Sequence, residues 1–181
     1  MRITYVLIAA TMCGIVGLSM ADETGSQAKD QGKHATISAS EFVKHAGADG
    51  LAEVEMGKLA SQKGSDPQLK AFATKLVADH TKANDELKAI AAAKNLEVPT
   101  SAGMTQKAMM EKFQHQSGGK DFDEAFAKHM VKDHKDAIEL FEKAAGDASL
   151  DADLRTFAKQ ALPTLRDHLK SAEALESRLS T

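Results

Sequence analysis

Residues 64–94, GSDPQLKAFATKLVADHTKANDELKAIAAAK, hold a helix boundary followed by one complete amphipathic helix. Gly64 ends the preceding helix, Asp66 caps the next one, and Pro67 takes its first position, where the missing N–H costs nothing. Beyond Pro67 the apolar residues recur every three or four positions, which is the spacing of one helix face. They are Leu69, Phe72, Ala73, Leu76, Ala83, Leu87 and Ile90. The stretch therefore predicts a helix that packs against other helices.

The same signals predict three further long helices on the two sides of this stretch. Ser38 and Glu41 have the spacing of a capping box at the first helix, and Asp121 is expected to cap the third. Pro163 lies inside the fourth, where it must remove one backbone hydrogen bond. The predicted long helices span 39–63, 67–94, 121–145 and 150–179, and a shorter one spans 105–116.

The connections between the long helices are short, long and short. An antiparallel hairpin, a long crossover and a second hairpin are typical of ferritin-like bundles with one crossover. We therefore predict an all-α fold, a ferritin-like four-helix bundle over residues 38–180, with the second and third long helices parallel. A simple up-down-up-down bundle stays open if the 105–116 helix only decorates one end.

The first 21 residues have the features of a secretory signal peptide. Arg2 is followed by an uncharged apolar run over 3–20, and Ser19-Met20-Ala21 fits small-x-small cleavage. An uncleaved membrane anchor is the rival interpretation, since the run approaches spanning length. The cleavage pattern favours removal, so we expect a mature chain that begins at Asp22 and resides in the periplasm or outer cell envelope.

Residues 22–37 are polar and predict a disordered tether before the bundle. The single cysteine, Cys13, lies in the predicted signal peptide, so the mature chain has no thiol chemistry. The net charge of −3 supplies no basic surface for nucleic acid. We also expect no stable membrane insertion of the mature chain. A second copy of the chain and another envelope protein are the partners left open.

Three histidines fall on the apolar faces of three predicted helices, when 100° of rotation is counted per residue. His80 and His168 lie at the centres of their stripes, and His134 lies off the centre of its own. Each of the three directly follows an aspartate. The first helix has no such histidine, but Glu53 shares its apolar face, and Asp49 or Glu55 are the carboxylates that could replace it.

These four residues also share one level of the predicted bundle. With helices two and three parallel, Glu53, His80, His134 and His168 lie about ten to thirteen residues from one end, at about 1.5 Å per residue. Buried imidazoles and a buried carboxylate need partners. The four together predict a site for a divalent transition metal (zinc, iron, manganese or copper). The other interpretation is a polar layer in which they bind only one another or water.

The remaining histidines are weaker candidates. His45 with Asp49 and His129 with Asp133 are spaced four apart on helices, and such pairs are usually solvated surface contacts. His34 and His115 are expected to be exposed, in the tether and in the crossover.

Three stretches resemble one known family: EVEMGKLASQKGSDPQLKAFATKLVADHTKANDEL (53–87), HMVKDHKDAIELFEKAA (129–145) and LRTFAKQALPTLRDHLKSA (154–172). The chain is similar over residues 40–175 to the bacterial "domain of unknown function 4142" family, whose members are often labelled outer membrane proteins and grouped with the ferritin-like superfamily. The resemblance implies a ferritin-like bundle in the cell envelope and no established activity. This sequence departs from di-iron bundles because it contains no Glu-x-x-His, which argues against a di-iron oxidase or an iron-storage cage.

Two functions of different class follow from these residues. One is an exported metal-binding protein for metal handling or stress protection, with Glu53, His80, His134 and His168 as ligands. The other is a non-catalytic envelope interaction module, whose buried His/Glu layer only sets the helix register. An enzyme ranks third, because no activated nucleophile and no Gly-rich cofactor loop is present.

Overall fold

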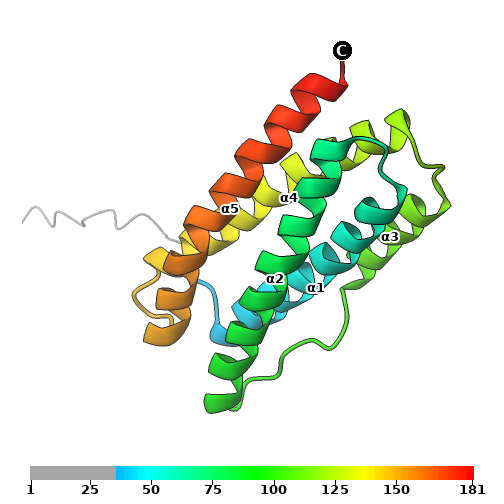
Figure 1. Cartoon of the computed structure of the whole chain (residues 1–181). Helices are drawn as coiled ribbons and strands as arrows, with labels where there is room; N and C mark the ends of the chain where they lie inside the picture. The colour runs from blue at the N-terminus through cyan, green and yellow to red at the C-terminus, as the bar shows by residue number, and fades with distance from the viewer. Residues whose placement is uncertain (1–35) are drawn as a thin grey trace, which may run out of the picture. The chain divides into compact units, whose positions relative to one another are not determined.

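The computed structural model describes residues 36–181. They form five helices, α1 (Ala39–Lys63), α2 (Pro67–Ala93), α3 (Met104–His115), α4 (Lys120–Gly146) and α5 (Ala152–Leu179), and no strand occurs among them (Figure 1). The all-α class and every predicted helix are confirmed, with ends that differ from the expected ones by at most two residues. The predicted signal peptide and all of the tether before residue 36 lie outside the described residues.

Contacts between helix ends fix the directions of the helices. Phe42, near the start of α1, packs against Phe141, near the end of α4, with ring centroids 5.3 Å apart. Arg178, at the end of α5, pairs at 2.7 Å with Asp66, which precedes α2. Neighbouring helices are therefore antiparallel, and α2 and α4 are parallel. This confirms the crossover topology and excludes the up-down-up-down bundle.

Side chains cap three of the four long helices, two of them as predicted. The Ser38 hydroxyl accepts a hydrogen bond from the Glu41 amide at 3.2 Å, and Glu41 accepts one from the Ser38 amide at 3.1 Å. Asp66 caps α2 by accepting hydrogen bonds from two backbone amides, and Asp151 caps α5 in the same way. These side chains satisfy N–H groups that a helix leaves free at its first turn.

The start of α4 differs from the expectation. Asp121 does not cap it, because the helix already begins at Lys120 after Gly119, whose φ of 110° suits glycine. Asp123 is the structural carboxylate here, and its side chain is 1% exposed. It accepts hydrogen bonds from the backbone amides of Ser65 at 3.1 Å and Asp66 at 2.8 Å. Asp123 thereby ties the α1–α2 turn to the start of α4.

The buried apolar side chains form two clusters, one towards each end of the bundle. One is built around Leu69, Leu76, Phe122, Phe126, Met130 and Leu175, and the other around Phe42, Leu87, Phe141, Leu154, Phe157 and Leu165. On each long helix, one predicted polar residue falls in sequence between the two clusters. The predicted polar level therefore separates two apolar halves of the core.

Gly57 sets how closely α1 approaches α2. A Cβ atom at this position would lie 2.8 Å from the Val77 side chain and 2.9 Å from the Ala73 carbonyl oxygen. Only glycine permits this approach without a shift of the backbone. Gly57 lies one turn after Glu53, so the close contact also brings Glu53 towards α2.

Helix α3, within the crossover, lies along α1 (Figure 1). Phe113 of α3 is buried and packs against Phe122 of α4, with ring centroids 5.7 Å apart. At the other end of the bundle, Ile37 is 7% exposed, and its amide donates to Asp147 at 3.0 Å. Packing thus extends one residue into the predicted tether. None of the helices among the described residues is long and apolar enough to cross a membrane.

Candidate metal centre

The three predicted histidines meet inside the bundle. His80 of α2, His134 of α4 and His168 of α5 each offer one ring nitrogen, and the three atoms lie within 4.8 Å of one another. His134 and His168 are fully buried, and His80 is 8% exposed. The apolar stripes of three helices have therefore turned three imidazoles towards a single point.

Glu53 of α1 joins this cluster. Its Oε2 atom lies 2.7 Å from Nε2 of His80 and 3.3 Å from Nε2 of His134. The two substitutes that spacing left open lie elsewhere, because Glu55 is exposed and Asp49 accepts a hydrogen bond from the Gln106 amide of α3. All four predicted residues therefore lie together, with Glu53 as the carboxylate.

Neighbouring groups determine which nitrogen of two histidines carries the proton. Nδ1 of His134 lies 2.9 Å from the Met130 carbonyl oxygen, which can only accept, so this nitrogen donates. Nε2 of His168 lies 2.8 Å from the Asp79 carboxylate and donates to it. Lys75 is farther from this nitrogen, at 3.4 Å, and its own short contact is with Asp79. Both rings are thus oriented by a hydrogen bond of the kind found behind metal-binding histidines.

The remaining nitrogens of these two rings face each other. In the neutral rings, Nε2 of His134 and Nδ1 of His168 both present lone pairs, yet they lie 3.3 Å apart. The Glu53 carboxylate oxygen adds a third acceptor, also 3.3 Å from Nε2 of His134. Two nitrogens that bind one ion tetrahedrally at about 2.0–2.1 Å are themselves about 3.3 Å apart. The spacing between these two nitrogens matches that of two ligands on one cation, and the three ring nitrogens together lie within 4.8 Å of one another.

The contact between Glu53 and His80 is close but poorly aligned. Their atoms lie 2.7 Å apart, but Glu53 Oε2 and His80 Nε2 make no hydrogen bond of acceptable angle within the described part of the chain. Unsatisfied buried polar atoms are rare and costly. With His80 neutral and its proton on Nδ1, both atoms offer lone pairs to a cation, although the pair must separate slightly to adopt tetrahedral spacing.

Glu53 carries the negative charge of the cluster. Burial would raise the pKa of Glu53, but the charges of His80 and His134 and the His80 contact outweigh it and lower the pKa to about 2. Burial also lowers the pKa of His168 to about 4, despite the Asp79 hydrogen bond that favours its charged form. At neutral pH the cluster therefore contains an anionic carboxylate and a neutral His168, which is the form that binds metals.

This donor set fits one divalent transition metal ion. Three imidazole nitrogens and one carboxylate oxygen suit zinc, manganese, iron or copper. Only one carboxylate belongs to the cluster among the described residues, which does not provide the bridging carboxylates of a di-iron pair.

Asp79 is the residue at this cluster that sequence reasoning missed. The sequence shows Asp79 directly before His80. In the structure, however, Asp79 of α2 contacts His168 of α5 and orients that ring. The charge of Asp79 is fixed in turn by Lys75 at 2.6 Å. The signal in the sequence was the position of Asp79, one residue before His80 and therefore at the edge of the apolar helix face that contains His80.

The expectation that His129 and Asp133 make a solvated surface contact is wrong. The pair forms, with atoms 3.1 Å apart, but the side chains are only 15% and 31% exposed. The ring of His129 packs on Phe113 of α3, with centroids 5.5 Å apart, so the crossover helix covers the pair. Burial, together with the charges of Glu53 and Asp49, raises the pKa of Asp133 to about 7.

The other predicted histidine positions are simpler. His45 and His115 are exposed, and Asp49, the expected partner of His45, contacts Gln106 instead. His34 lies outside the described residues.

Comparisons with known proteins identify a family and a fold. A family model with the description "Domain of unknown function (DUF4142)" matches residues 23–175. The crystal structure of a conserved hypothetical protein, rv2844, from Mycobacterium tuberculosis is similar, with a TM-score of 0.59 and 19% sequence identity over 75% of this chain and 88% of that chain. At this identity the likeness concerns the fold alone. No curated protein matches the chain.

Proposed function

The chain belongs to the domain of unknown function 4142 (DUF4142) family, and we propose that this member is an exported protein that binds one divalent transition metal ion in its core. The ligands are His80, His134, His168 and Glu53. The protein serves metal handling or stress protection in the cell envelope.

One observation carries this proposal. With both rings neutral, Nε2 of His134 is an acceptor that lies 3.3 Å from two further acceptors, Glu53 Oε2 and His168 Nδ1, while the protons of both rings point outward to Met130 and Asp79. Facing lone pairs in a buried core repel each other. A cation at their centre turns that repulsion into three bonds.

The surroundings of the cluster support a site that is formed before the ion binds. His134 is held by a backbone carbonyl and His168 by Asp79, so neither ring needs to reorient. The apolar clusters on both sides of the four ligands hold the helices in register, so the ligands stay at the same height in the bundle. Preorganised ligands lose little conformational freedom when the ion binds, and this favours affinity.

Export rests on the N-terminal sequence. The match to the family model begins at Glu23, two residues after the expected cleavage site at Ala21. A family domain that starts there supports the interpretation of residues 1–21 as a removable signal peptide. The mature chain then meets metal ions in the envelope.

The second candidate is a structural module, and a specific contact favours it. Glu53 and His80 lie 2.7 Å apart; burial lowers the pKa of His80, but the charge of Glu53 outweighs it and raises that pKa. A buried ion pair of this kind can fix helix register without any metal. In that case a proton on His80 takes the place of the cation.

Thermal denaturation with and without metal separates the two candidates. For an ion that binds only the folded state, stability rises with its concentration, and a hundredfold excess over Kd adds about 2.7 kcal/mol. Zn²⁺ or Mn²⁺ should therefore raise the Tm of the chelator-treated, untagged protein but leave that of His80→Ala unchanged. Equal Tm values of the unsubstituted protein with and without each of the four metals would support the structural module instead.

A further inference from the structure

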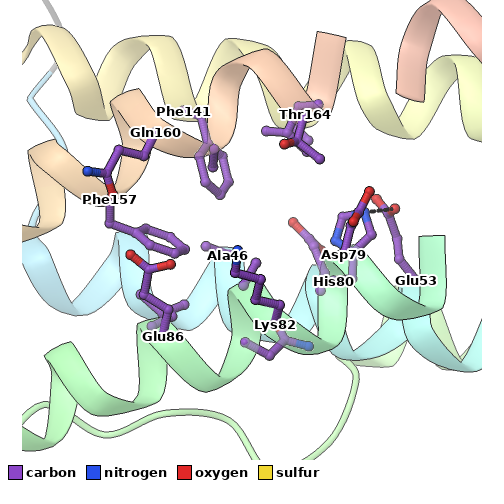
Figure 2. A pocket seen from close by; sticks show the side chains of 18 of the residues that line it. Ala46, Glu53, Asp79, His80, Lys82, Glu86, Phe141, Phe157, Gln160 and Thr164 are labelled. Carbon is purple, nitrogen blue, oxygen red and sulfur yellow. Dashed lines mark ion pairs between the residues drawn. The ribbon is translucent and has the colours of Figure 1, made fainter. Parts of the chain in front are cut away.

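A cavity of about 250 Å³ adjoins the metal-binding cluster. Figure 2 shows it with the rings of Phe141 and Phe157 at one end and Glu53, Asp79 and His80 at the other. Lys82 of α2 and Gln160 of α5 also line it and are exposed, so it opens to solvent between these two helices.

Small residues create this space. Each long helix contributes an alanine to the cavity lining, and α1 adds Gly50; the alanines are Ala46, Ala83, Ala137 and Ala161. Longer apolar side chains at these four positions would fill the space, as leucine and phenylalanine side chains fill the two apolar clusters. These small side chains leave an apolar part of the cavity, which Asn84, Gln160 and Thr164 also line.

The polar end of the cavity carries metal ligands. Glu53, His80 and His168 line it, whereas His134 does not. An ion held by all four would lie with His134 behind it and the cavity in front. The atoms Glu53 Oε2 and His80 Nε2, which have no aligned hydrogen-bond partner among the described residues, are at this end.

Size and charge together indicate the class of ligand. An apolar cavity of about 150 Å³ accommodates benzene, so a cavity of about 250 Å³ accommodates one aromatic ring with a short substituent. A divalent cation with one carboxylate and neutral imidazoles keeps a net charge of about +1. Three further carboxylates line the cavity, but Asp79 pairs with Lys75 at 2.6 Å, Asp49 accepts a hydrogen bond from Gln106, and Lys82 offsets Glu86. One anionic oxygen donor would neutralise the net charge of the metal centre.

We propose that this cavity binds a small aromatic monoanion, with the ring between the four alanines and the anionic oxygen as a fifth ligand of the metal ion. The inference rests on the proposed metal site and adds its ligand class. The metal supplies the attraction for the anion, and the small-residue layer, closed by Phe141 and Phe157, selects the ring.

Benzoate and acetate test this, because they share the carboxylate and differ in the ring. Co²⁺-loaded, untagged protein is titrated with each, and the visible spectrum of the bound Co²⁺ reports coordination. Benzoate should bind roughly tenfold or more tightly than acetate, since burial of a ring contributes more than 1.4 kcal/mol.

Two cavity-filling variants, Ala161→Leu and Ala83→Leu, should bind Co²⁺ with unchanged stoichiometry and lose the preference for benzoate. The matched control, Ala174→Leu, changes an exposed alanine of α5 and should keep that preference. Equal affinities for benzoate and acetate, or an undiminished preference in both filled variants, would overturn this inference while the metal site stands. Failure of Co²⁺ to bind at all would overturn the proposed function and this inference with it.

Discussion

Asp79 of α2 and His168 of α5 lie 2.8 Å apart, carboxylate oxygen to Nε2, and join the two helical hairpins at the level of the buried cluster. Asp79 is 33% exposed by its side chain, whereas His168 is fully buried. This contact fixes the His168 proton on the outer nitrogen and turns the other nitrogen inward. The metal proposal depends on it.

Substitution Asp79→Asn should therefore weaken metal binding without removing a ligand. Loss of a carboxylate behind a metal-binding histidine costs about 10–100-fold in affinity. Competition with a chelating dye measures this, and Asp85→Asn, an exposed position on the same helix, is the matched control. Equal affinities of Asp79→Asn and Asp85→Asn would show that His168 does not need its partner.

Asp133 predicts a pH dependence of stability in the metal-free protein. Burial and nearby carboxylates raise its pKa from 3.8 to about 7 in the folded protein. The folded state therefore favours the protonated side chain, and this contribution to stability is fully present below about pH 3.8 and is lost as the pH rises through about 7. At higher pH the buried ionised carboxylate destabilises the fold, and Asp133→Asn removes that cost. It should be more stable than the unsubstituted protein at pH 8, on the order of 1 kcal/mol after allowance for partial exposure, and equally stable at pH 4.

Urea denaturation in the presence of a chelator measures the difference. Asp136→Asn is the control, because Asp136 is exposed and its side chain pairs with Lys132. A stability difference between Asp133→Asn and the unsubstituted protein that does not change from pH 4 to pH 8 would contradict the assignment.

Asp123 should matter far more to stability than Asp121. Asp123→Ala leaves the partly buried amides of Ser65 and Asp66 without their acceptor, at a cost of about 1–3 kcal/mol. Asp121→Ala changes an exposed side chain that caps no helix and should alter stability by less than about 0.5 kcal/mol. Urea denaturation measures both. Similar losses of stability in the two variants would contradict this assignment and indicate that Asp121 caps the helix.

Export makes a prediction that is independent of the site. Mass spectrometry of the protein recovered from the envelope fraction should give a chain that begins at Asp22, because Ser19-Met20-Ala21 fits the cleavage pattern. An Ala21→Leu variant, which breaks the small-x-small pattern, should retain the apolar segment. An intact Met1 in the unsubstituted protein, or a lipid on Cys13, would refute the processing.

Helix positions and the shared level of the four site residues could be predicted from sequence because they depend on local rules. Caps, proline and glycine mark the ends of helices, and 100° per residue places His80 and His168 on their apolar faces. The short, long and short connections then give the helix directions, and these set the levels. All of this is contained in spacing along one chain.

What spacing could not give was contact between helices. Glu53 and Glu55 lie about 200° apart around α1, and each has apolar neighbours on its own side. Packing decides between them: α2 comes close to α1 at Gly57, Glu53 meets His80, and Glu55 stays exposed. Asp79 and Asp123 reach residues 89 and 57 positions away. The burial of Asp133 depends on where α3 packs. These outcomes follow from tertiary packing, which the pattern of one helix does not contain.

Metal content per chain tests the central claim most directly. The protein is prepared without a histidine tag, exposed to equimolar Zn²⁺, Mn²⁺, Fe²⁺ or Cu²⁺, freed of unbound ions and analysed by mass spectrometry of the elements. The account predicts about one ion per chain for at least one of these metals, and none for His80→Ala, with His45→Ala, an exposed histidine of α1, unchanged. Metal content well below one per chain for all four ions, equal in the unsubstituted protein and in His80→Ala, would contradict it.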